Sequence, residues 1–202
     1  MGRSRGSGAG GRGSAGQQSI AAILTAAGEL ASLYGLERLS MAVLASAVGM
    51  SKGGLYAHFD SKEELQVATI EHVSAVFAEK VLHGSLDDSA AGLDALLERW
   101  LSFFEQKVFP GGCFLISAAV EFANRPGPVH DALEAALDGE IGALETTIRR
   151  ANKTGELNPE KDARQTAFEL HSILMNTHAL FQVKDNPAVF NQARAAIHKL
   201  LA

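Results

Sequence analysis

The sequence predicts an all-α protein of about nine helices. From Gln17 onward, apolar residues recur at three- and four-residue spacing in every long segment, which is the period of a helix with one buried face. No segment alternates apolar and polar residues between hairpin turns, as half-buried strands would. With 202 residues, 47% of them hydrophobic, the chain can bury a sizeable core as one large domain or two small ones.

Composition argues against several classes of protein. No run of 18 apolar residues is present, which argues against a membrane span, and the first residues lack the apolar stretch of a secretory signal. The single cysteine, Cys113, forms neither an internal disulfide nor a cysteine-rich zinc site. HExxH, GxSxG and Walker motifs are absent, so an enzyme is not expected. We predict a cytoplasmic protein without cofactor or metal.

The first elements are a tail and a helix. Residues 1–16 contain seven Gly, three Ser and three Arg. Such a segment buries too little surface to offset its ordering entropy, so a disordered tail is predicted, and its arginines leave a contact with DNA phosphate open. A helix follows from Gln17, and Gly35 can end it. Its apolar face consists of Ile20, Ile23, Leu24, Ala27, Leu30 and Tyr34.

Three serines can cap the helices that follow. Ser40 can open a short helix that stops before Gly49, and Ser51 a second one that runs through Phe59. Ser61 and Glu64 have the spacing of a capping box at the start of a longer helix.

Five further helices are predicted after a break at residues 83–88. An aromatic-rich helix ends at Pro110, a short apolar helix covers about residues 113–123, and a long helix follows the proline pair 126 and 128. Asn158-Pro159 and Asn186-Pro187 each resemble an N-cap residue followed by a proline in the first helical position. They are therefore predicted to start the last two helices.

Residues 39–59 have the pattern of a helix-turn-helix. Gly49 can adopt the positive φ of the turn, and the small Ala45 lets the two helices approach closely. The apolar residues that would face inward are Leu44, Val48, Met50 and Leu55. The residues left exposed on the second helix are Ser51, Lys52, Gly53, Gly54, Tyr56, Ala57 and His58, with no acid among them.

This exposed face suits the major groove of DNA. Lys52 can donate to guanine or to phosphate, and Tyr56 and His58 can donate to phosphate oxygens. Gly53 and Gly54 each cost roughly 1 kcal/mol of helix stability relative to alanine. Close approach of the backbone to DNA is a reason to carry them.

The distribution of charge agrees with this interpretation. The net charge is −5, but residues 1–62 carry six basic and three acidic residues, whereas the remainder carries 12 basic and 20 acidic residues. A basic first third on an acidic body indicates that the first part meets a polyanion. Ser40 and Lys62, at the starts of neighbouring helices, are expected to bind further phosphates.

Residues 20–73 resemble the DNA-binding domain of the TetR (tetracycline-repressor) family of bacterial regulators. The shared pattern includes Leu44-Ala45-x2-Val48-Gly49-Met50-Ser51-Lys52-Gly53, then Leu55-Tyr56-x-His58-Phe59 and Lys62-x2-Leu65. Ala57 stands where the family commonly has a larger polar or aromatic residue. The resemblance implies that residues 17–63 are the DNA-binding domain. It also implies DNA contacts at Ser40, Lys52, Gly54, Tyr56, His58 and Lys62.

The resemblance further implies that residues 64–202 bind a small-molecule effector and form a homodimer through the last two helices, about 160–201. The expected function is a repressor of a palindromic double-stranded DNA operator, released by the effector. Its half-sites would lie about one helical turn apart, roughly 34–36 Å. The broad apolar faces of the last two helices would be costly to expose on a monomer. They carry Ala167, Leu170, Leu174, Ala179, Phe181, Phe190, Ala193, Ile197, Leu200 and Leu201. An activator or constitutive DNA binder of this fold, and a protein-binding helical module, remain alternatives.

Aromatic and polar residues of the body are candidate effector contacts. These are Trp100, Phe104, Cys113, Phe114, Ser117, Glu121, His171, Met175 and His178. His171, Met175 and His178 share one helical face, but no third metal ligand accompanies the two histidines. Ordinary core packing is the alternative for most of these residues.

Cys113 has two interpretations. It follows two glycines near a predicted helix start, where the helix dipole would lower the thiol pKa and favour reaction with electrophiles. The alternative is a buried, unreactive thiol among Phe114, Leu115 and Ile116.

Overall fold

A computed structural model describes residues 11–83 and 92–202, with side chains from Ile20 onward in the first helix. These ranges contain nine α-helices, one π-helical turn and no strand, as the sequence predicts. None of these helices is long and apolar enough to cross a bilayer. They are α1 (Gly11–Tyr34), α2 (Met41–Ala47), α3 (Lys52–Tyr56), α4 (Lys62–Phe77), the π-helical turn η1 (Ala78–Leu82), α5 (Leu93–Glu105), α6 (Leu115–Phe122), α7 (Pro128–Thr154), α8 (Ala163–Lys184) and α9 (Ala188–Leu201).

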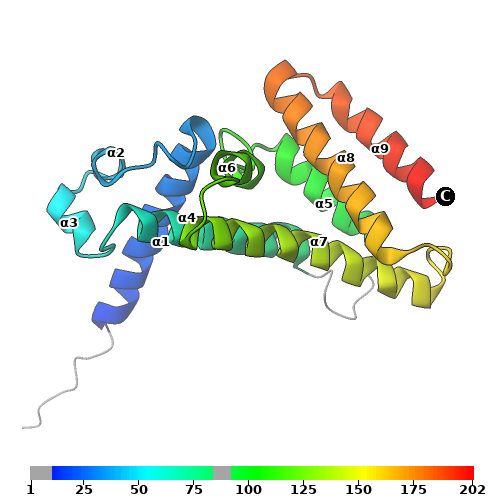
Figure 1. The fold of residues 1–202 in the computed structure, drawn as a ribbon, viewed down its shortest axis with the longest axis horizontal. Coiled ribbons are helices and arrows are strands. Elements are labelled where there is room, and N and C mark those ends of the chain that lie inside the picture. Colours follow the sequence, from blue (N-terminus) through cyan, green and yellow to red (C-terminus); the bar gives the residue numbers. More distant parts are fainter. Residues whose placement is uncertain (1–10, 84–91) are drawn as a thin grey trace, which may run out of the picture.

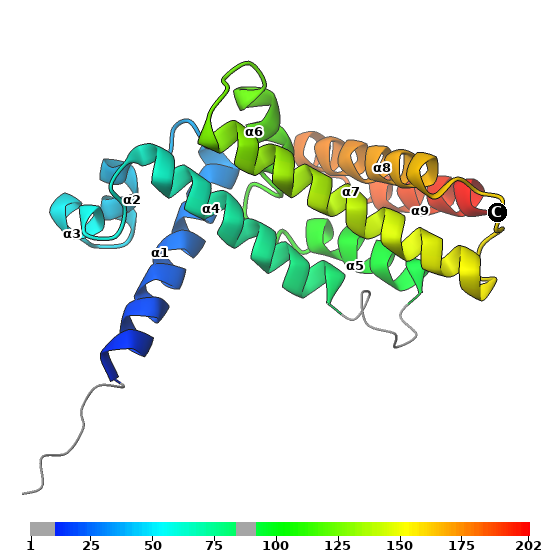
Figure 2. The same cartoon turned by 60° about the horizontal axis from the view of Figure 1, so that its bottom comes forward.

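Two long helices connect the two ends of the molecule (Figure 1). α2 and α3 lie at one end beside α1, and α5, α8 and α9 lie at the other, while α4 and α7 run side by side between them in both views (Figure 2). One continuous apolar core extends from Ile23 in α1 to Ile197 in α9. The end that carries the helix-turn-helix is therefore packed against the body and not tethered to it by a linker.

The three predicted serine caps are confirmed. The hydroxyl oxygens of Ser40, Ser51 and Ser61 accept the backbone N–H three residues further on, at 3.3, 3.0 and 3.0 Å. Glu64 reaches back as a capping box predicts, but it accepts the backbone N–H of Asp60, at 2.5 Å, and not that of the N-cap residue Ser61. Each cap gives a partner to a donor that the first helical turn leaves unpaired, so these boundaries follow from local chemistry.

The start of α1 differs from the prediction. The helix begins at Gly11, so residues 11–16 are helical where composition indicates a disordered tail. Residues 1–10 lie outside the described part of the chain. Ile23 and Ala27 are buried and anchor the helix, and extending an existing helix costs far less than nucleating one.

The start of α8 is a second correction. Asn158-Pro159 does not begin a helix, because the Asn158 side chain accepts the N–H two residues further on, at 3.0 Å, within a turn. α8 begins at Ala163, where the carboxylate of Asp162 accepts the N–H of Gln165 at 2.8 Å. An Asx turn and an N-cap use the same side-chain chemistry, so the sequence motif does not distinguish them.

The prediction at Asn186-Pro187 is confirmed to within one residue. The Asn186 side chain accepts the N–H of Ala188, the first residue of α9, at 3.0 Å. The second short helix is shorter than predicted, since α3 ends at Tyr56 and the chain continues to Phe59 as a tight turn.

Candidate nucleic-acid interface and effector site

α2 and α3 form the helix-turn-helix predicted from residues 39–59. Gly49 has a φ of +69°, and the next residue, Met50, donates its N–H to the carbonyl of Ala45 at 2.9 Å. Ala45, Leu44 and Leu55 are buried. The turn and this packing set the direction in which α3 leaves the domain.

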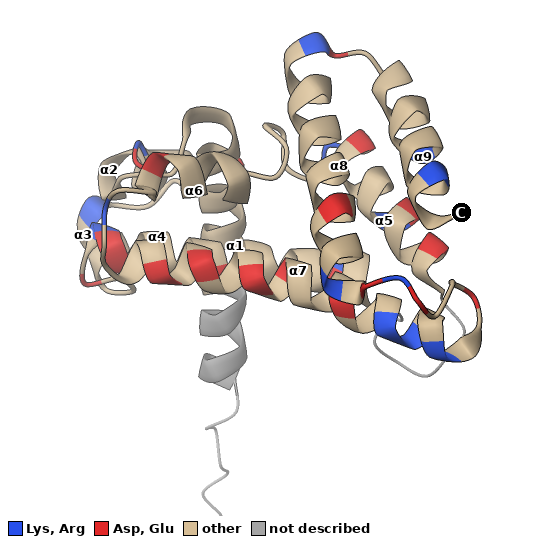
Figure 3. Cartoon of the chain, turned by 45° about the vertical axis from the view of Figure 1, so that its right-hand side comes forward, with Lys and Arg blue, Asp and Glu red and all other residues tan. Residues whose placement is uncertain are grey.

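The outward side of α3 carries the residues that we predicted to contact DNA. Lys52, Gly53 and Tyr56 are exposed, whereas Gly54 and His58 are half-buried. The ammonium nitrogen of Lys52 lies 5.8 Å from the centroid of the Tyr56 ring, so the two side chains share one surface. This surface lies at one end of the molecule, and the acidic residues of α7 lie along the body (Figure 3).

No contact within the described chain requires a glycine at position 53. A Cβ built on Gly53 would have no neighbour within 4 Å, and its φ is not positive. Glycine therefore weakens α3 by roughly 1 kcal/mol relative to alanine, with no benefit to packing. The sequence-based prediction that the α3 backbone approaches DNA closely at this residue is compatible with this geometry.

Lys62 is engaged within the protein. Its Nζ donates to the carbonyl oxygen of Glu37 at 2.5 Å and lies 3.1 Å from the Glu37 carboxylate. The guanidinium of Arg125, between α6 and α7, lies 3.0 Å from the other oxygen of the same carboxylate. Glu37 thus joins the start of α4 to the body, and a DNA phosphate would compete with it for Lys62.

Glu121, a predicted effector contact, lies at the same junction and not among the interior aromatic residues. Its Oε2 accepts the backbone N–H of Glu37 at 3.2 Å. Its Oε1 would lie 3.2 Å from a Cβ at Gly35, whose φ is +90°. The roles of Glu37 and Arg125 were missed by sequence reasoning, because isolated charged residues in loops form no recognisable pattern.

The loop from Phe109 to Cys113 is held between α1 and α8. Gly111 donates its N–H to the hydroxyl of Ser32 at 3.0 Å, and a Cβ on it would lie 1.9 Å from the Ser32 carbonyl oxygen. Gly112 has a φ of +79°, and a Cβ there would lie 2.2 Å from Nε2 of His178. The two glycines are thus required by packing, and the loop that they form leaves Cys113 buried.

Cys113 itself is buried, with 5% of its surface exposed. Burial, and next to it the charge of Glu140, raises the pKa of the thiol well above its usual range, against a smaller opposing effect of the Leu115 backbone. The residue precedes Phe114, the N-cap of α6, and so lies outside that helix. The expected lowering of the thiol pKa is absent, and the geometry is that of the buried, unreactive alternative.

His178 is kept neutral by its surroundings. The backbone N–H of Cys113 donates to its Nε2 at 3.1 Å, and burial lowers the pKa of His178 to about 4. His171, which the sequence places on the same face, instead lies 3.2 Å from the carboxylate of Glu140. The two histidines therefore have separate partners and do not converge on one metal position.

Four of the predicted effector residues meet inside the body. The Trp100 ring centroid lies 6.0 Å from that of His171, and the Phe104 ring centroid lies 4.8 Å from that of His178. Phe114 is also buried, Met175 is half-buried, and the hydroxyl of Ser117 donates to the carbonyl of Phe114 at 2.8 Å. Phe104 and Phe114 are packed as core, whereas Trp100 and His171 border a region in which buried polar atoms lack hydrogen-bond partners.

A buried carboxylate that the sequence analysis missed completes that region. Glu140 of α7 is 4% exposed, and its Oε2 lies 3.2 Å from Nε2 of His171. Its Oε1 has no hydrogen-bond partner, and neither has the buried Ser74 hydroxyl or the Trp100 ring nitrogen. In the sequence, Glu140 is one of several acids on an amphipathic helix, so nothing marks it as buried.

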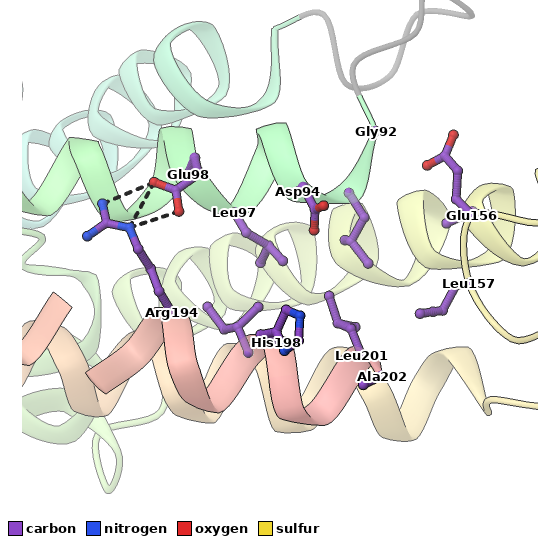
Figure 4. A pocket seen from close by; sticks show the side chains of 13 residues that line it. Gly92, Asp94, Leu97, Glu98, Glu156, Leu157, Arg194, His198, Leu201 and Ala202 are labelled. Carbon is purple, nitrogen blue, oxygen red and sulfur yellow. Dashed lines mark hydrogen bonds and ion pairs between the residues drawn. The ribbon is translucent and has the colours of Figure 1, made fainter. Parts of the chain in front are cut away.

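A cavity of about 820 Å³ lies between α5, α9 and the end of α7, and Glu140 is not among the residues that line it (Figure 4). Arg194 of α9 and Glu98 of α5 pair at its side, with Nε and Oε1 2.9 Å apart. Residues 84–91, which precede Gly92 at its edge, lie outside the described part of the chain. We assign no site to this cavity.

A helix-turn-helix with an exposed, acid-free second helix, packed on an all-α body, defines the class of helix-turn-helix DNA-binding proteins. Residues 23–69 match the family model described as bacterial regulatory proteins, tetR family. Residues 89–197 match the model described as the tetracyclin repressor-like C-terminal domain. The chain belongs to the TetR family of transcriptional regulators. Proteins of this family are DNA-binding regulators without enzymatic activity, and repression and homodimer formation are typical of them.

Individual relatives agree with this assignment. The nucleoid occlusion factor SlmA of Marinobacter nauticus is 31% identical over 132 residues, which cover 64% of this chain and 64% of that protein's length. Among solved structures, a TetR transcriptional regulator from Chloroflexus aurantiacus has a TM-score of 0.79 at 23% identity, covering 93% of this chain and 94% of that one. The regulatory protein TetR from Rhodobacter sphaeroides also has a TM-score of 0.79, at 20% identity, covering 89% and 97%. These structural likenesses concern the fold.

The substitution Gly53→Ala is expected to raise the stability of the protein and to weaken its binding to DNA. Because the position is open and helical, alanine is expected to stabilise the protein by roughly 1 kcal/mol and raise Tm by about 2–4 °C. Its methyl group is expected to weaken DNA binding at least about tenfold, which corresponds to roughly 1.4 kcal/mol. The control is Gly142→Ala in α7, which is equally open and should raise Tm without changing affinity. Unchanged DNA affinity in Gly53→Ala would contradict a close approach at this residue.

Stability is expected to fall with acidification because of His178. Its pKa of about 4 lies below the reference of about 6.5, so the unfolded state takes up the proton more readily. The contribution of neutral His178 is present above about pH 6.5 and is lost as the pH falls towards 4. Urea unfolding at pH 7 and pH 4.5 should show a loss that is about 2–3 kcal/mol smaller in His178→Gln. His72, whose pKa is also lowered by burial, remains in both proteins and serves as the common background. Equal losses in the two proteins would mean that the His178 ring is not buried in solution.

Cys113 is expected to react slowly in the folded protein. With its thiol buried and its pKa raised, iodoacetamide at pH 7 should label it far more slowly than it labels free cysteine, and unfolding in urea should restore the normal rate. Rapid labelling of the native protein, accompanied by release from DNA, would instead support the sensor interpretation.

Proposed function

We propose that the protein is a homodimeric transcriptional repressor that binds a palindromic operator through α3 and is released by a small-molecule effector. The observation that carries the proposal is the exposed face of α3, where Lys52 and Tyr56 flank the open backbone of Gly53. An α-helix fits the major groove, and a face without acidic residues meets phosphates without repulsion.

The proposed DNA contacts are of two kinds. Lys52 is the candidate for reading base edges, because it is exposed at the start of α3. Phosphate contacts come from the hydroxyl of Tyr56, the ring of His58 and the hydroxyl of Ser40, which still has a proton to donate while it caps α2. Lys62 joins them when phosphate displaces the Glu37 carboxylate from its ammonium group. Ser51, Gly53 and Gly54 allow the backbone of α3 to approach the groove.

The α8 face supports dimer formation. Phe168 is 61% exposed and Val183 is 86% exposed, and Ala179 lies between them on the same stripe. The argument from the sequence rested on apolar residues of both α8 and α9, but Leu170, Phe190 and Ile197 are buried within their own chain, with the Phe190 ring centroid 4.8 Å from that of Phe181. The uncovered surface is therefore on α8, and a second copy of the chain would cover it.

Coupling between effector and DNA requires that the effector bind the DNA-free geometry better than the DNA-bound one. Such coupling is typically about 1–3 kcal/mol and acts equally in both directions. The contacts available for it are the Glu37 junction with Lys62 and Arg125 and the clamp of Gly111 on Ser32, because both join α1 or α4 to the body.

The test of DNA recognition uses the two tyrosines of the chain. Footprinting on DNA upstream of the protein's own coding region should show protection, with affinity that falls steeply with salt. Tyr56→Phe should weaken binding by about tenfold without lowering Tm, because the hydroxyl is exposed. Tyr34→Phe is the control and should bind normally, because Tyr34 is likewise exposed but lies at the end of α1. The proposal fails if Tyr56→Phe binds normally, or if DNA of random sequence binds as tightly as the upstream DNA.

The dimer is tested by charge on the α8 stripe. Val183→Asp should raise the dimer dissociation constant by about 100-fold or more, because each interface would bury two unpaired carboxylates. Val120→Asp on α6 introduces the same charge at a residue that is 76% exposed, and it should leave the dimer intact. Sedimentation at micromolar concentration distinguishes the outcomes, and a Val183→Asp protein that remains dimeric would move the interface elsewhere.

A further inference from the structure

We propose that the effector is a small apolar molecule with a protonated amine, bound between α4 and α7 with its nitrogen at Glu140. This inference rests on the proposed function and specifies the ligand class of the effector site. A cavity of about 200 Å³ lies there, bounded by the end of α4, η1 and the middle of α7. It is lined by Ser74, Phe77, Ala78, Leu82, Ala135, Ala136, Gly139 and Glu140.

Two oxygens at this cavity lack partners. Oε1 of Glu140 and the hydroxyl of Ser74 are buried and make no hydrogen bond, although both residues line the space. A buried carboxylate oxygen without a donor costs free energy, and native proteins keep few such groups without a reason. A ligand that donates hydrogen bonds satisfies both oxygens at once, and an ammonium group has three donors.

The surrounding charge favours a cation over a neutral donor. From Pro128 to Thr147, α7 carries Asp131, Glu134, Asp138, Glu140 and Glu145 and no lysine or arginine (Figure 3). Lys80, on the adjoining turn, lines a different hollow together with Arg99. The partner of Glu140 in the described chain is the ring of His171 at 3.2 Å. A site with this excess of acidic groups concentrates cations.

The rest of the cavity wall is apolar and aromatic. Phe77 lines it, and the Phe77 ring centroid lies 4.7 Å from that of Trp100, whose own ring nitrogen is unpartnered. Aromatic faces attract an ammonium group, and the alanines and Leu82 accommodate an apolar body. A volume of about 200 Å³ is smaller than that of most drug sites, which limits the ligand to a single ring or a short chain.

The position of the cavity connects it to the DNA-binding end. α4 carries Ser74 and Phe77 at the cavity and Lys62 at its other end, about 22 Å away along the helix axis. An amine bound between α4 and α7 would contact α4 directly, and the first residue of α4, Lys62, is paired with Glu37. The site is thus placed to act on the geometry of α3.

The test compares three probes of one shape: benzylamine, benzyl alcohol and benzoate at pH 7. Benzylamine, in about 100-fold excess over its Kd, should raise Tm by about 5 °C or more, whereas benzyl alcohol should do so weakly and benzoate not at all. Glu140→Gln should abolish the benzylamine shift. Glu145→Gln, on the same helix but paired with Arg149 at the surface, is the matched control and should keep it.

Gly139→Leu provides a second variant, because Gly139 lines the cavity and a Cβ there meets nothing within 4 Å, so that a leucine is expected to fit and to obstruct the cavity. It should lose the benzylamine shift with Glu140 intact. A shift that persists in both Glu140→Gln and Gly139→Leu, a shift equally large with benzoate, or no shift with benzylamine would each overturn the proposal. Footprinting of the ligand-free protein tests the proposed function separately. A failure to bind DNA there would refute the repressor and not the amine site.

Discussion

The relation between the two ends of the molecule depends on a backbone contact that only glycine permits. Gly111 passes so close to Ser32 that a Cβ on it would lie 1.9 Å from the Ser32 carbonyl oxygen. A Cβ on Gly112 would likewise lie 2.2 Å from Nε2 of His178. The loop is thereby pressed between α1 and α8, and the hydrogen bond from Gly111 to Ser32 attaches it to the DNA-binding end. The same contact delivers the N–H of Cys113 to His178, which requires a neutral ring. The close packing of the loop, the neutral ring of His178 and the buried thiol of Cys113 thus occur together at this one contact.

Around this clamp, the polar groups divide into two sets. At the junction, the Glu37 carboxylate pairs with Lys62 and Arg125, and the Glu37 backbone N–H donates to Glu121, so each of these polar groups has a partner. In the body, Glu140, Ser74 and Trp100 each retain an unpartnered polar atom. A satisfied network stabilises one arrangement of the two ends, whereas an unsatisfied buried group leaves free energy for a ligand to recover. The proposed repressor, with a DNA-bound and a ligand-bound geometry, would use the two sets in these two ways.

The glycine at position 53 of α3 differs from several other glycines of the chain in having no structural requirement among the described residues. Elsewhere the chain's glycines include several that geometry demands, at Gly35 and Gly49 for positive φ and at Gly111 for space. Gly53 has neither reason within the protein. A glycine that weakens its own helix without a packing benefit agrees with the proposed close approach of DNA to α3.

The sequence by itself determined the helical fold, the three serine caps, the glycine turn at Gly49 and the exposed face of α3. These features depend on residues within one or two helical turns of each other, and apolar period and capping chemistry act over that range. Tertiary structure alone decided which charged residues meet. Lys62 pairs with Glu37, and Glu121 accepts the N–H of the same residue from 84 positions away. Glu140 is buried, whereas the acidic residues Asp131, Glu134 and Asp138 of the same helix are exposed. It also decided that Asn158 turns the chain where Asp162 caps the helix, that α9 is covered by its own chain, and that Cys113 is enclosed. The pairing and burial of a side chain depend on segments distant in sequence, and no local pattern encodes them.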